Sequence, residues 1–166
     1  ESGRILTSSE LEERHLGAFL TPLKLVSQIC FDRELEYTQA FQDLVISWAD
    51  YDVLLDIRED MEAGLVLFSE EELRKNCLKI TLGEPVPSEF NEFLREKKKR
   101  VIRELLERSP SVKESNIPVF EREALRLYFI SRATKLLISD CSVPTPMTYR
   151  RSIESSYGIS LPSPAI

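Results

Sequence analysis

Apolar residues recur at three- and four-residue spacing along most of this chain, which is the period of an amphipathic α-helix. The clearest stripe is Tyr37, Phe41, Leu44, Val45 and Trp48, and Gln39, Gln42 and Asp43 fall on the opposite side. We expect Tyr37, Phe41 and Trp48 to lie in the core. The pattern predicts an all-α fold, a single-domain bundle of about six or seven helices followed by an extended C-terminal tail.

Capping signals set the expected boundaries of the first helices. Thr7 and Glu10, and likewise Ser9 and Glu12, form overlapping capping boxes that predict a helix from about residue 8. Thr21-Pro22 has the form of an N-cap followed by proline at the first helical position, so a second helix is expected over about 22–31. Asp32 is placed to cap the helix after that.

Further helices are expected over about 50–64, 69–80, 88–108 and 119–138. Gly64 suits the left-handed cap that ends the first of them, and Ser69 with Glu72 forms a third capping box. The apolar run over 65–68 has no clear period. The last helix is apolar on nearly every side, which predicts that it is the central one.

The composition changes sharply near residue 142. Residues 1–141 are expected to form one all-α interaction domain, whereas 142–166 are rich in proline and serine and are typical of a tail. Apolar residues in the tail would allow it to dock as a peptide in a groove. The chain begins without an initiator methionine, so we expect it to be part of a longer intracellular protein.

Charge is distributed unevenly along the 166 residues, whose formal net charge is −6. The first 92 residues carry 20 acidic and 8 basic side chains, and the remaining 74 carry 8 and 14. A nucleic-acid partner is not expected, because phosphate affinity requires clustered lysine and arginine. Such polarity favours a protein partner or a second copy. Without a run of eighteen apolar residues, no membrane span is predicted.

The residues that carry chemistry are sparse. His15 is the only histidine, so Glu12-x-x-His15 lacks the second pair that a carboxylate-bridged metal site requires. Cys30, Cys77 and Cys141 are far apart and include no Cys-x-x-Cys, which is typical of reduced thiols in an intracellular protein. We therefore predict no catalytic residue, no cofactor and no metal ligand.

The strongest basic run begins at Lys97. Lys97 and Lys98 fall inside the apolar arc of their predicted helix, so their stems either lie over apolar neighbours with the ammonium groups in water or reach an acidic or phosphorylated partner. A nuclear-import signal is a third interpretation. The predicted contact residues are Lys97, Lys98, Arg100 and Arg103, with Tyr149, Arg150, Arg151 and Tyr157 of the tail, where phosphorylation would add charge beside the arginines.

Two functions follow from these patterns. The first is a non-enzymatic protein–protein interaction domain, with an adaptor, regulatory or scaffold role, in the cytoplasm or nucleus. The alternative is a small Mg²⁺-dependent helical phosphohydrolase that uses the carboxylates of Asp56, Glu59, Asp60 and Glu62.

Overall fold

The computed structural model describes residues 5–81 and 85–143, and within these two ranges it contains six α-helices and no strand. This confirms the all-α prediction; the tail from residue 144 onward lies outside the described residues. The helices are α1 (Ser8–Phe31), α2 (Gln39–Leu55), α3 (Ile57–Glu62), α4 (Glu70–Lys75), α5 (Phe90–Arg108) and α6 (Val119–Ile138), with a short 3₁₀ helix, η1 (Ser109–Glu114), between α5 and α6.

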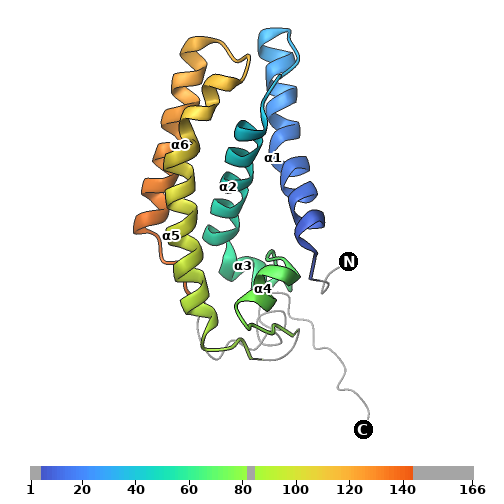
Figure 1. Ribbon diagram of the computed structural model, residues 1–166, viewed down its shortest axis with the longest axis vertical. Coiled ribbons are helices and arrows are strands. Elements are labelled where there is room, and N and C mark those ends of the chain that lie inside the picture. The colour runs from blue at the N-terminus through green and yellow to red at the C-terminus, as the bar shows by residue number, and fades with distance from the viewer. Residues whose placement is uncertain (1–4, 82–84, 144–166) are drawn as a thin grey trace, which may run out of the picture.

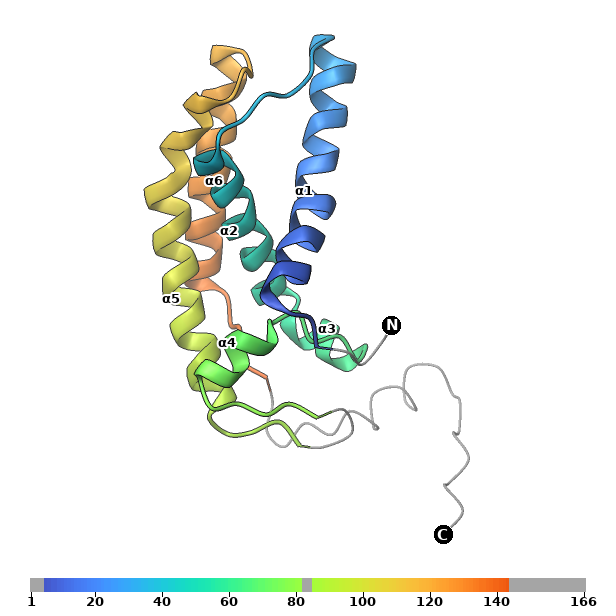
Figure 2. The ribbon, with the colours of Figure 1, turned by 45° about the vertical axis from the view of Figure 1, so that its right-hand side comes forward.

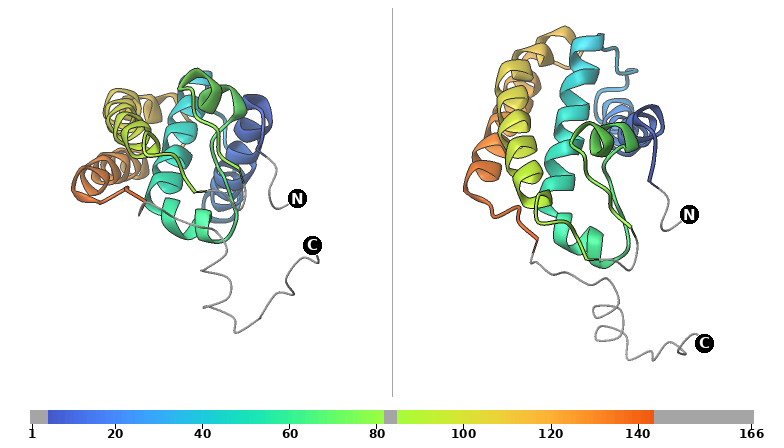
Figure 3. Two further views of the ribbon diagram at one scale, coloured as in Figure 1. Left: turned by 90° about the horizontal axis from the view of Figure 1, so that it is seen from below. Right: turned by 60° about the horizontal axis from the view of Figure 1, so that its bottom comes forward.

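The four long helices run lengthwise, and α3 and α4 close one end of the bundle (Figures 1 and 3). Helix α2 is the central element, since it packs against α1, α3, α5, α6 and η1. The prediction that the last helix is central is therefore wrong. Helix α6 lies at the outer edge, on the side opposite α1, and part of its apolar surface is exposed.

Aromatic rings join the helices on both sides of α2. The Trp48 ring contacts Phe19 of α1 at 4.8 Å between centroids and Phe129 of α6 at 5.7 Å. Phe68, in the loop before α4, packs edge-on against Phe93 of α5 at 5.1 Å. Phe41 is fully buried, as the stripe predicted, while Tyr37 and Trp48 are partly buried against the core.

Helix α1 is one element of 24 residues, so the break expected at Thr21-Pro22 is wrong. Its apolar positions Leu16, Phe19, Leu20 and Leu23 continue across Pro22 against the core, and this packing keeps the segment helical. The capping box of Thr7 and Glu10 is confirmed at the helix start. Asp32 does not begin the next helix but ends α1, in a left-handed conformation with φ 49°. Segment 32–38 then crosses to α2 (Figure 2).

The short helices α3 and α4 end in the same backbone motif. The N–H of Leu65 donates to Asp60 and that of Leu78 donates to Leu73, each after a residue with positive φ. Gly64 is the residue with positive φ after α3, as predicted, and Cys77 is the corresponding residue after α4. The helix predicted over 69–80 therefore stops at Lys75, and the one predicted from residue 50 is divided between α2 and α3.

Replacing Pro22 by alanine should stabilise the domain. The proline ring removes one helical hydrogen bond from the interior of α1 and is exposed, so no core contact is lost on substitution. The substitution also raises the conformational entropy of the unfolded chain, which is a smaller, opposing effect. We expect the free energy of unfolding in urea to rise by about 2 kcal/mol in total. An unchanged or reduced value would mean that packing of α1 requires the proline.

Candidate functional site

A buried lysine joins three helices at the closed end of the bundle. Lys97 of α5 is only 4% exposed, and its Nζ lies 2.9 Å from Asp50 Oδ1 of α2 and 2.9 Å from Glu72 Oε2 of α4. The same ammonium lies 5.3 Å from the centre of the Phe68 ring. The sequence-based interpretations of Lys97 are therefore corrected: its ammonium group is neither in water nor accessible to a partner.

Glu72 explains why the capping box of α4 is only half formed. The Ser69 hydroxyl accepts the Glu72 N–H at 3.1 Å, as the motif predicts. The Glu72 carboxylate, however, binds Lys97 and Arg100. Burial raises the pKa of Glu72, but its contacts with Lys97 and Arg100 outweigh this effect, so the pKa lies below its ordinary value. The six-residue helix α4 is thus held to α5 by charge.

His15 lies beside this network on the buried side of α1. It is 5% exposed, and its Nε2 has no hydrogen-bond partner within the described part of the chain. Burial lowers the pKa of His15; Asp50 opposes this shift and Lys97 adds to it. Burial therefore favours the neutral form of the imidazole over the charged form. It lines a cavity of about 380 Å³ together with Asp50, Glu72 and Lys97.

The other predicted basic residues do not share one surface. Lys98 donates to the carbonyls of Leu137 and Ser139 at 3.1 and 2.7 Å, which places a cation at the C-terminus of α6. Arg100 is half exposed and paired with Glu72, and Arg103 is exposed. The predicted tail residues Tyr149, Arg150, Arg151 and Tyr157 lie outside the described residues.

The four carboxylates of the alternative function, Asp56, Glu59, Asp60 and Glu62, do not all belong to one helix. Asp56 lies between α2 and α3 with non-helical dihedral angles, because α2 ends at Leu55. Burial raises the pKa of Asp52 and of Asp60, and the charge of Asp56 raises both further. Over 5–81 and 85–143, the structure contains no group of three or more histidine, cysteine, aspartate or glutamate side chains arranged to hold a metal ion.

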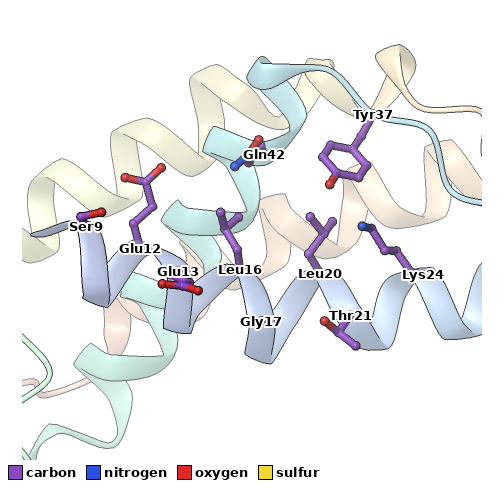
Figure 4. A pocket seen from close by; sticks show the side chains of 10 residues that line it. All are labelled: Ser9, Glu12, Glu13, Leu16, Gly17, Leu20, Thr21, Lys24, Tyr37 and Gln42. Carbon is purple, nitrogen blue, oxygen red and sulfur yellow. The ribbon is translucent and has the colours of Figure 1, made fainter.

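A groove of about 510 Å³ lies between α1 and α2, next to segment 32–38 (Figure 4). Leu16 and Leu20 point from α1 into it, and Gln42 of α2 and Tyr37 lie above them. Lys24 stands at one end, with its Nζ 5.2 Å from the centre of the Tyr37 ring. Ser9, Glu12, Glu13, Gly17 and Thr21 complete the lining.

Helix α6 presents an apolar face to solvent. Phe120 is 83% exposed and Ile138 is 82% exposed, and Leu127 lies between them on the same side of the helix. We call this surface the α6 outer face; its members, all exposed and uncharged, are Phe120, Ala124, Leu127, Ser131, Thr134 and Ile138. The apolar character of this helix is visible in the sequence, but it led to the prediction that the helix is central.

Comparisons of the chain with protein-family models, with curated proteins and with solved structures found no match. Among the described helices, none combines the length and the apolar character that crossing a membrane requires. Three features of the described structure bear on its function: the ion-pair network, the groove and the α6 outer face.

Removing the buried cation should destabilise the domain strongly. The substitution Lys97→Met leaves the carboxylates of Asp50 and Glu72 without their central partner in a largely buried site. We expect the free energy of unfolding, measured in urea, to fall by about 3 kcal/mol or more.

The matched control is Lys99→Met, two residues along the same helix. Lys99 is 60% exposed and, among the described residues, its one ion pair is with Glu96, so its loss should change the free energy of unfolding by less than about 1 kcal/mol. Equal effects of the two substitutions would contradict the structural role assigned to Lys97.

Stability should also depend on pH through His15. Because its pKa is lower in the folded protein than in the unfolded chain, the unfolded state binds the proton more readily. Stability is then complete above pH ~6.5 and falls on acidification toward the folded-state pKa, by at most about 1.4 kcal/mol per pH unit. Urea unfolding between pH 7.5 and 5 should show this slope in the wild type but not in His15→Gln.

Proposed function

We propose that this protein is a non-enzymatic interaction domain that binds another polypeptide through the α6 outer face. The observation that carries the proposal is the exposure of Phe120, Leu127 and Ile138 along one side of α6. Folded monomers rarely leave a contiguous apolar strip on the surface unless it contacts a partner. Val119 and Leu137, also exposed, lie about 100° around the helix from Phe120 and Ile138 and widen the exposed apolar surface at its two ends.

The spacing within the α6 outer face favours a helical partner. Phe120, Leu127, Thr134 and Ile138 follow the seven- and four-residue spacing of a seam between two helices; three of these four residues are apolar, and Thr134 carries a hydroxyl. Helix α6 has 20 residues and is therefore about 30 Å long. An amphipathic helix of similar length is the partner that this seam accommodates.

The rest of the bundle supports this role by holding α6 in place. Helix α6 packs against α2, α5 and η1, and Lys98 binds the carbonyls at its C-terminal end. A rigid helix loses little conformational freedom when a partner binds, which favours affinity. Cys30, Cys77 and Cys141 are free thiols, and we place the domain in a reducing, intracellular compartment on that basis.

A photoreactive amino acid at position 127 of the full chain tests the proposal. Irradiation in cells should join it to a discrete polypeptide, whereas the same residue at Lys113, exposed on η1, should not. With the purified partner, Leu127→Asp should weaken binding about tenfold or more, the effect of losing a central apolar contact.

Lys113→Asp is the matched control and should leave the affinity unchanged. Circular dichroism should show both variants folded, because Leu127 and Lys113 are exposed. Equal affinities of Leu127→Asp and the wild type would refute the assignment of this face.

A further inference from the structure

The groove between α1 and α2 has a defined order of charges along α1. The exposed carboxylates of Glu12 and Glu13 come first, Leu16 and Leu20 follow, and Lys24 stands at the far end (Figure 4). Neither carboxylate forms an ion pair within the part of the chain that the structure describes. Twelve residues of helix separate Glu12 from Lys24, which is about 18 Å.

The same chain carries a segment with the complementary order. Residues 150–154 read Arg-Arg-Ser-Ile-Glu, two cations followed by an apolar residue and an anion. In extended form, Arg150 and Glu154 are about 13 Å apart. The long arginine, glutamate and lysine side chains span the remaining few ångströms.

We propose that residues 150–154 bind in the groove of their own chain. In this arrangement Arg150 and Arg151 pair with Glu12 and Glu13. Ile153 packs on Leu16, which is only partly buried, and Glu154 pairs with Lys24. The groove contains no residue of the α6 outer face, so each proposal can be tested without the other.

The described chain reaches a suitable starting point for this contact. Val143 is buried, its N–H donates to Asn91 Oδ1 at 2.9 Å and its carbonyl accepts from Asn91 Nδ2 at 3.0 Å. These bonds fix it beside the start of α5, and α5 begins at the end of the bundle where α1 also begins (Figures 1 and 2). Since α1 packs on α2 and α2 on α5, about 16–20 Å separates α1 from α5. Seven extended residues from Val143 to Arg150 span about 23 Å.

Covalent linkage is the reason to favour this segment over a separate peptide. The groove is open, and exposed ion pairs contribute little each, so a free peptide would bind weakly. A segment on a short linker has an effective concentration in the millimolar range. At an effective concentration of about 1 mM, a tenfold excess of the bound form over the free form requires a dissociation constant of about 0.1 mM.

Disulfide trapping in the full chain tests this arrangement. Cys30→Ser and Cys77→Ser remove the exposed thiols, and Gly17→Cys with Ile153→Cys introduces a pair between groove and segment. A Cβ added at residue 17 meets no atom within 4 Å, so the cysteine is accommodated. We expect the cross-link within one chain to form about tenfold faster than in a control pair, Glu59→Cys with Ile153→Cys.

Charge reversal then tests the pairing. Glu12→Lys with Glu13→Lys should reduce the trapping rate to that of the control pair, because the groove would then repel the two arginines. Adding Arg150→Glu with Arg151→Glu to the same chain should restore the rate, since the charges are again opposite.

The matched control for charge is Glu89→Lys with Glu92→Lys. These two exposed carboxylates lie at the start of α5 and do not line the groove. Their reversal changes the net charge by the same amount and should leave the trapping rate unchanged.

Three results would overturn the proposal. The first is equal trapping rates for the groove pair and the Glu59 pair, and the second is a rate insensitive to reversal at Glu12 and Glu13. The third is a cross-link between two molecules whose rate rises with protein concentration, since the occupant would then be a second copy. Circular dichroism monitors the folding of each variant. If the variant with Glu12→Lys and Glu13→Lys unfolds, the variant with only Arg150→Glu and Arg151→Glu tests the same charge pairing.

Discussion

The ion-pair network around Lys97 is the interaction on which the closed end of the bundle depends. Helix α4 has six residues and cannot be stable by itself, yet it contributes Glu72 to a site shared with α2 and α5. Burying these charges is unfavourable unless each has its partner, so an arrangement of the three helices that separates Lys97 from Asp50 and Glu72 is disfavoured. Glu71 also connects α4 to the start of α1, because its carboxylate accepts a hydrogen bond from the Ser8 N–H at 2.8 Å.

Periodicity predicted the long elements well and the junctions poorly. The limits of α6 were predicted directly, because an uninterrupted apolar period is bounded there by Pro118 and Ser139. The break at Pro22 was not real, since tertiary packing of Leu20 and Leu23 outweighs the local effect of one proline. The end of α4 at Lys75 was not predicted, because the residue that follows it in the left-handed region is Cys77, and a cysteine in that region is uncommon.

The candidate sites were also difficult to predict from local sequence. Two lysines inside an apolar arc marked an unusual place in α5, but the partners that explain Lys97 come from helices 25 and 47 residues earlier. A single sequence does not report such pairings. The α6 outer face was missed for a related reason. Apolar residues on all sides predict a helix that is covered all round, and only the topology shows that no other described element covers this side of α6.

The clamp between Asn91 and Val143 also has a mechanical consequence. Its two hydrogen bonds, with the bond from Arg58 to the Ser142 carbonyl, fasten the chain to the beginning of α5 and to α3 after α6 has ended. A pulling force applied beyond residue 143 must break these bonds before it can load α6. Tension from the C-terminal side is thereby taken up at one corner of the bundle, and the helix that exposes the apolar strip is shielded from it.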